Sequence, residues 1–341
     1  MYSGWPPITL FLSALIISAC GSDLSASIIL SPMAFNLALE MGFNPFVALV
    51  GIWGGSMAVM MFPWTTTGGI NLGTMMGSLT EAEAYAGTYF AGATGFVFLT
   101  IEFIVICLIT KAFKPKNTSA MTQEKTATFN KVQSTTIKVI LIVLVLIIIP
   151  SLIQLLAPNP VTKWISSNLS AQLLWTAGSL VLALLKCGNL KEIITKKVPW
   201  DPIILVVGMS LLFGLANPMG VVNTLGNILL SVPGWCVPPI LAFICAFLSF
   251  FVSGAIIGPF FIPMAATLAA TSGVSLSVIL TCVVAGAGVS SVSPVSQGGA
   301  SALTGCPTAE LSAVMMNKQM KLAIINMCIY AVYALLLSVI F

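Results

Sequence analysis

The chain has 341 residues, of which 58% are hydrophobic and 6% are charged. Water-soluble domains carry roughly a quarter charged residues, so this composition excludes a soluble enzyme, a nucleic-acid-binding protein and a disordered chain. The net charge of +4 comes from 13 lysines and 9 acidic residues, and the chain has no histidine. Without an imidazole a Ser-His triad is excluded as well. We therefore expect an all-α protein that spans a membrane several times and is not an enzyme.

Several of the apolar segments are shorter than the roughly 20 residues that a straight spanning helix needs. Two pairs of them share a small or polar tip, 8–20 with 24–39 and 238–252 with 255–271. We expect each pair to form a re-entrant hairpin, which enters and leaves the membrane on one side and whose tip is buried in protein or lines a wet cavity. The predicted apolar segments are 8–20, 24–39, 46–62, 88–110, 137–157, 169–185, 202–215, 219–232, 238–252, 255–271, 276–292 and 321–341.

The lysines lie in alternate loops between these segments. Six lie in or beside the central stretch 112–136, four lie within 186–197, and two precede the final helix. Because lysine near the ends of spans marks the cytoplasmic side, we expect the central loop in the cytoplasm and the C-terminus outside the cell (inner or plasma) membrane. The first hairpin then opens to the cytoplasm and the second to the outside.

An internal repeat relates the two halves of the chain. Residues 22–63 align without a gap with residues 253–294, an offset of 231, and 11 of the 42 positions are identical. Just beyond each aligned block a polar, glycine-rich stretch, Pro63–Gly69 or Pro294–Gly299, interrupts an apolar segment. We expect each half to hold a re-entrant hairpin and a broken helix in opposite orientations, which is the inverted repeat typical of secondary transporters. The predicted units are a first repeat over 1–111, a cytoplasmic linker over 112–136 and a second repeat over 137–341.

The hairpin tips and helix breaks predict a solute site near the middle of the membrane. A helix that begins there presents unpaired N–H groups and a partial positive charge, which favour an anion. Hydroxyl groups add donors, and unwound carbonyls suit a hard cation such as Na⁺. The predicted substrate-binding residues are Ser22, Thr65, Thr66, Ser253, Ser296, Gln297 and Gly298, and the predicted residues for cation or proton coupling are Asp23, Gly68 and Gly299.

Each of these residues also has a structural interpretation. Asp23 suits the N-cap of the helix that follows it, and serine and threonine commonly bond neighbouring helices in membranes. Glu102 interrupts an apolar span, where it serves either in ion coupling or as a polar contact between packed helices. The sequence carries no motif for a cofactor or a bound metal, so Na⁺ would be a transported ion.

The arrangement resembles the ion-transporter superfamily, in particular the divalent anion:sodium symporters and the malonate/dicarboxylate carriers. The resemblance is carried by Ser22-Asp23-Leu24 with Pro32-Met33-Ala34, by Ser253-Gly254-Ala255 with Pro263-Met264-Ala265, and by the Pro-x-Ser-x-Gly-Gly-Ala form of Pro294–Ala300. It implies symport of a dicarboxylate or monocarboxylate with a cation, and a homodimer joined through scaffold helices. The chain departs from the family in keeping only the Ser of each Ser-Asn-Thr tip motif. It also lacks roughly ninety residues of scaffold helix that an inverted repeat places before the first hairpin.

Other functions stay open at this point. A carrier for gluconate, citrate or arsenite would share the fold and the site. An intramembrane hydrolase would need a histidine base or a buried aspartate pair, and the sequence offers neither. The missing scaffold helices also suit a non-functional remnant of a longer carrier. The expected partners are a small organic anion and the lipid bilayer, with no nucleic acid.

Overall fold

The computed structural model describes residues 6–19, 23–113, 130–156, 159–161, 164, 168–169, 171–197, 200, 204, 208, 211, 215 and 219–341. These residues form helices joined by turns, with no strand among them, so the prediction of an all-helical fold is confirmed for this part of the chain. Four segments in it are long and apolar enough to cross a membrane, judged by length and composition. They are Glu81–Ile109, Lys131–Pro150, Gly254–Ser272 and Ala309–Ile340.

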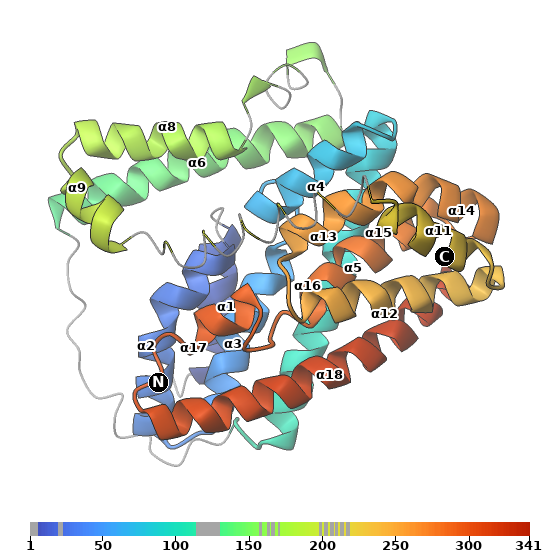
Figure 1. Cartoon of the computed structure of the whole chain (residues 1–341). Coiled ribbons are helices and arrows are strands. Elements are labelled where there is room, and N and C mark those ends of the chain that lie inside the picture. Colours follow the sequence, from blue (N-terminus) through green and yellow to red (C-terminus); the bar gives the residue numbers. More distant parts are fainter. Residues whose placement is uncertain are drawn as a thin grey trace. The chain divides into compact units, whose positions relative to one another are not determined.

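The chain divides into two compact units, Ser119–Val207 and the combination of Met1–Thr118 with Gly208–Phe341. The unit over Ser119–Val207 contains α6 (Lys131–Leu156), α8 (Ala171–Leu184), α9 (Leu190–Glu192) and the π-helix η2 (Ile193–Lys197). Within it α6 and α8 lie side by side (Figure 1). The division by compactness does not test the predicted repeat boundaries, which remain predictions.

The larger unit contains the remaining described helices. They are α1 (Pro6–Ala19), α2 (Asp23–Met41), α3 (Pro45–Val59), α4 (Thr66–Met76), α5 (Glu81–Ile109), α11 (Val221–Leu230), η3 (Gly234–Cys236), α12 (Val237–Ser249), α13 (Gly254–Phe261), η4 (Ile262–Met264), α14 (Ala265–Ser272), α15 (Leu276–Val284), α16 (Gly286–Val289), α17 (Gln297–Leu303) and α18 (Ala309–Ile340). Local chemistry sets several of the starts. Asn44 caps α3, Thr80 and Glu83 form a capping box at α5, and Thr308 caps α18.

The helix boundaries recur at the offset found in the sequence. Helices α1, α2, α3 and α4 begin at residues 6, 23, 45 and 66, and adding 231 gives 237, 254, 276 and 297, where α12, α13, α15 and α17 begin. Helices α5 and α18 end at residues 109 and 340, which differ by the same offset. The turns after α2 and α14 also match, since Gly42 and Gly273 take left-handed φ angles of 69° and 72°. The two halves therefore share one order of helices and breaks.

The two halves pack against each other in a reciprocal way. Helix α2 of the first half contacts α17 of the second, and α13 of the second half contacts α4 of the first. At the first contact Ser31 Oγ donates to Ala302 O at 2.7 Å. At the second, Asn71 lies against Gly258, and residues 71 and 302 are equivalent under the offset of 231. Such an exchange of contacts is what a two-fold relation between halves produces.

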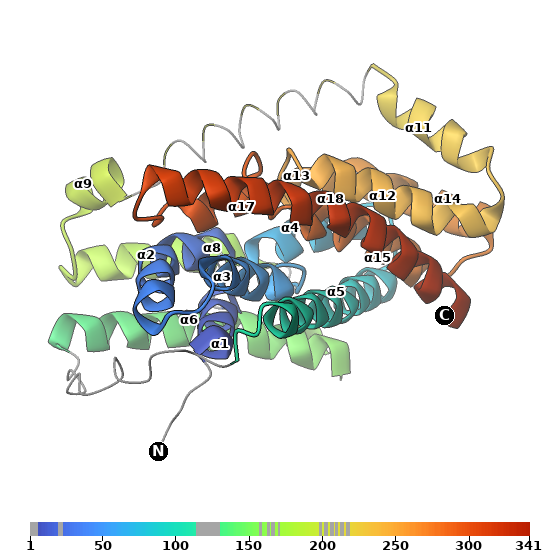
Figure 2. The ribbon, with the colours of Figure 1, turned by 90° about the horizontal axis from the view of Figure 1, so that it is seen from below.

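The longest helices lie along the shorter ones and leave apolar faces uncovered. Helix α5 packs beside α15, and α18 packs beside α12 (Figure 2). Large apolar side chains on both helices are exposed, among them Ile101 and Leu108 on α5 and Ile329 and Leu336 on α18. Exposed apolar area of this kind suits a surface that meets lipid rather than water.

Candidate functional site

The two helix breaks adopt the same loop conformation. In the first, Thr65 Oγ1 donates to Met60 O at 2.6 Å; in the second, Ser296 Oγ donates to Ser291 O at 3.1 Å. Residues 65 and 296 are equivalent under the offset of 231, and so are residues 60 and 291. The backbone bonds repeat too, because the N–H groups of Thr65 and Ser296 donate to the carbonyls three residues earlier, both at 3.0 Å.

A glycine in the first turn after each break lets the chain fold back on itself. A Cβ added at Gly68 would overlap the carbonyl of Phe62, and one added at Gly299 would overlap the carbonyl of Ser293. These contacts are equivalent under the same offset of 231. The predicted coupling residues Gly68 and Gly299 thus have a packing reason for being glycine, and their coupling role stays a prediction.

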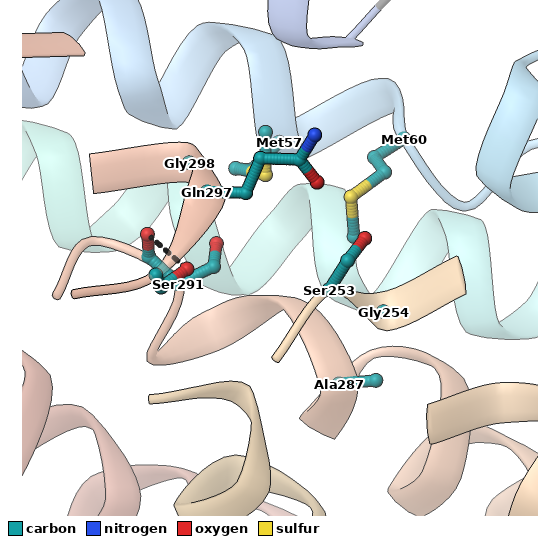
Figure 3. Close-up of a pocket in the computed structure, with 9 residues that line it drawn as sticks. Met57, Met60, Ser253, Gly254, Ala287, Ser291, Gln297 and Gly298 are labelled. Atoms are coloured by element: carbon teal, nitrogen blue, oxygen red, sulfur yellow. Dashed lines mark hydrogen bonds between the residues drawn. The ribbon is translucent and has the colours of Figure 1, made fainter. Parts of the chain in front are cut away.

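A small cavity lies where the second break meets the ends of two other helices. It is lined by Met57, Met60, Ser253, Gly254, Ala287, Ser291, Ser296, Gln297 and Gly298. Figure 3 shows Met60 reaching down toward Ser253, with Gln297 and Ser291 beside them; its dashed line is the bond between Ser296 and Ser291. The cavity therefore joins the tip before α13, the start of α17 and the end of α3.

Four of the predicted substrate-binding residues gather at this cavity, namely Ser253, Ser296, Gln297 and Gly298. Ser253 caps α13, and its Oγ accepts from Ala255 N at 3.4 Å. Ser296 occupies the cap position of α17. All the substrate-binding residues predicted in the second half therefore line one cavity.

The residues predicted in the first half are placed elsewhere or not described. Thr65 is buried as the cap of α4, with its Oγ1 accepting from Gly68 N at 3.1 Å, and it does not line the cavity. Thr66 is exposed and does not line it either. Ser22 lies outside the described residues. Asp23 is the first residue of α2, and its side chain also lies outside the described part.

Sequence reasoning missed Ser291 and the two methionines of the cavity. The Oγ of Ser291 accepts from Trp53 Nε1 at 3.2 Å and donates to Gly288 O at 2.6 Å. The repeat contained a signal for them, since Met60 and Ser291 are equivalent positions at the start of each break. At each break, the predicted set covered only residues beyond the proline, Pro63 or Pro294.

The electrostatics of the cavity come from helix ends and hydroxyls. None of its nine described lining residues carries a charge. Two helices, α13 and α17, begin at it, and helix starts carry unpaired N–H groups and partial positive charge. Its volume of 20 Å³ holds about one water molecule. An organic anion would therefore need this site to widen.

Helix α18 holds both ends of the second break. Asn326 Nδ2 donates to Val289 O at 2.7 Å, just before the break, and Gln319 Nε2 donates to Gly299 O at 3.0 Å, just after it. Between them Ser290 Oγ donates to Ala323 O at 3.2 Å. Any movement of the break must therefore rearrange bonds to α18.

A scan against models of known protein families and a search of curated proteins found no match to this chain. In the part of the chain that the structure describes, the fold is helical, with helices suited to a membrane and two equivalent breaks, one of which lines a small uncharged cavity.

Proposed function

We propose that the chain is a secondary active transporter of a small organic anion, a dicarboxylate or monocarboxylate, coupled to Na⁺ or H⁺. The observation that carries this proposal is that Thr65 and Ser296 make the same hydrogen bonds to the residues three and five positions before them, together with the small cavity at the second break. Interrupted helices in corresponding positions of two halves are the usual binding elements of such carriers. We also propose that the chain is related to the dicarboxylate carriers that its sequence resembles, and that it is not an enzyme.

The inverted arrangement is part of the proposal. Helices α1 and α12 have 14 and 13 residues, so each is about 20 Å long, short of the roughly 30 Å of a hydrocarbon core. Such helices suit re-entrant hairpins better than full spans. The lysine distribution supports opposite orientations, with the central loop in the cytoplasm and the C-terminus outside the cell membrane.

Binding of the anion would use backbone dipoles in place of a basic side chain. The starts of α13 and α17 supply N–H donors, and the hydroxyl of Ser253, which accepts from Ala255 N, adds its own hydrogen to them. The one-water cavity corresponds to a closed form that must open by relative movement of the halves. The reciprocal contacts, α2 with α17 and α13 with α4, are where that movement would occur.

The test is uptake by the full chain in proteoliposomes. We expect radiolabelled succinate or malonate to accumulate above the level of empty liposomes when an inward Na⁺ or H⁺ gradient is applied. Gluconate, citrate and arsenite serve as competitors, and stronger competition by one of them would assign the substrate to that class. Absence of carboxylate uptake and of exchange under both gradients would contradict the proposal.

A substitution at the cavity sharpens this test. Ser253→Ala removes one hydroxyl, and loss of one hydrogen bond to a charged group predicts uptake reduced by about tenfold or more. The matched control is Ser231→Ala, an exposed serine at the end of α11 whose hydroxyl bonds Ile228 O; it should transport like the wild type. Equal uptake by both variants would remove Ser253 from the site.

A further inference from the structure

One carboxyl group lies within a helix suited to cross the membrane and is not part of the cavity. Glu102 is on α5, beside the buried residues Leu99 and Phe103. Its Oε1 accepts a hydrogen bond from Asn326 Nδ2 at 3.0 Å. Its Oε2 is buried and has no hydrogen-bond partner among the described residues. An ionisable residue within a membrane-spanning helix is by default a candidate functional residue.

The described surroundings of Glu102 supply no balancing charge. The tyrosines of α18 are both engaged, because Tyr330 Oη donates to Thr281 O at 2.9 Å and Tyr333 Oη donates to Thr94 O at 3.1 Å. Helices α1, α3 and α4 hold no titratable side chain, and Cys282 is the titratable residue of α15. The other titratable residue in this part of α5 is the buried Cys107.

The charged residues of α18 all lie N-terminal to Asn326, the residue that contacts Glu102. Lys321 precedes Asn326 by five residues, which is about 7.5 Å along the axis and roughly 140° around the helix. Lys318 lies over the ring of Phe46, 5.6 Å from its centre, and Glu310 is in the first turn. Cys328 is exposed. An ionised Glu102 would thus rely on one neutral amide, whereas a protonated one needs no counter-charge.

We propose that Glu102 is the proton-binding residue of this carrier and that Asn326 connects it to the second break. The inference rests on the proposed transport function and assigns H⁺ as the coupling ion. The two hydrogens of Asn326 Nδ2 are divided between Glu102 Oε1 at 3.0 Å and Val289 O at 2.7 Å, the last residue before the break. Ionised Glu102 accepts more strongly than the neutral acid, so a change of protonation shifts Asn326 relative to Val289.

The first test detects the proton directly and needs no transported solute. Dicyclohexylcarbodiimide is an apolar reagent; the O–H of a protonated carboxyl adds across its C=N bond, and the adduct rearranges to a stable N-acylurea without losing atoms. In the full chain in liposomes we expect the adduct on Glu102 by peptide mass analysis. Its rate should fall about tenfold for each pH unit above the titration midpoint, as for a single acid.

Two variants make the labelling specific. Glu102→Gln keeps an oxygen that accepts from Asn326 and should show no adduct in this peptide, whereas Glu310→Gln, an exposed site at the start of α18, should leave the adduct on Glu102 unchanged. A Glu102 that stays unlabelled, or is labelled equally from pH 5 to pH 9, would overturn the proposal.

The second test separates this inference from the proposed function. If the wild type transports succinate, a pH gradient should stimulate uptake by the Glu310→Gln control as in the wild type, and Glu102→Gln should lose that stimulation by about tenfold. Stimulation retained in Glu102→Gln would overturn the inference and leave the transporter proposal standing. If Glu102 is labelled with the expected pH dependence but the chain moves no carboxylate, the transporter proposal is contradicted, and Glu102 is left as a proton-binding residue with no role in coupling.

Discussion

At the scale of single residues, the breaks depend on close approach between a glycine and a carbonyl. Gly68 meets the carbonyl of Phe62, but Gly73 on the same helix has nothing within 4 Å of an added Cβ. The two glycines therefore differ in their surroundings while sharing α4, and one helix supplies both the test and its control.

We predict that Gly68→Ala destabilises the protein by about 1–3 kcal/mol, the usual penalty for overpacking. Gly73→Ala should instead stabilise it by up to about 1 kcal/mol, because alanine favours a helix over glycine. The midpoint of thermal unfolding in detergent measures both. If the midpoint of thermal unfolding falls by the same amount in both variants, the close contact at residue 68 is contradicted.

The role of a single residue could be predicted only where the neighbouring sequence indicates it. The cap positions of Thr65 and Ser296 follow from polar residues at the point where an apolar segment resumes. The bond between Trp53 and Ser291 could not be predicted, since it joins residues 238 positions apart. Nothing in the local pattern of either residue indicates its partner.

At the scale of elements, α13 and α4 meet at one point of very close contact. A Cβ at Gly258 would overlap the side-chain amide of Asn71, which is buried and whose Oδ1 has no hydrogen-bond partner among the described residues. Helix α13 can approach α4 this closely only because residue 258 has no side chain. This pair therefore sets the spacing of two helices from different halves.

A double-mutant cycle tests that spacing. Gly258→Ala alone should destabilise the protein by about 1–3 kcal/mol, and the same change in an Asn71→Ala background should have a smaller effect, because the shortened side chain leaves room. Residues in direct contact give coupling energies of about 0.5–3 kcal/mol. Additive effects of the two substitutions would show that α13 and α4 do not touch at this pair.

The helices themselves were largely predictable, and their contacts were not. Apolar runs bounded by Pro, Gly and Ser located most of the helices, and the offset of 231 paired them. The predicted starts at 88 and 321 were late, because α5 begins at Glu81 and α18 at Ala309. The three bonds from α18 to the second break depend on Gln319, Ala323 and Asn326 sharing one face of a helix that reaches back over the chain. That placement is a result of tertiary packing, for which the sequence has no local signal.

At the scale of the whole molecule, the proposal requires two equivalent halves of opposite orientation. The described structure carries the equivalence in its helix starts, in its breaks and in the exchange of contacts between α2 with α17 and α13 with α4. The opposite orientation of the halves is the proposed part, and it rests on the distribution of the lysines along the sequence. The central claim is that the two halves are inverted. It is therefore decided by whether equivalent residues of the two halves lie on opposite sides of the membrane.

Glu40 and Thr271 are suited to that measurement, because they are exposed, lie near the ends of α2 and α14, and are equivalent under the offset of 231. Each is replaced by cysteine in a background whose 8 native cysteines are changed to alanine, and whole cells are treated with a membrane-impermeant maleimide. Thr271→Cys should be labelled in intact cells, and Glu40→Cys only after the membrane is permeabilised. Labelling of both from the same side would contradict the inverted arrangement.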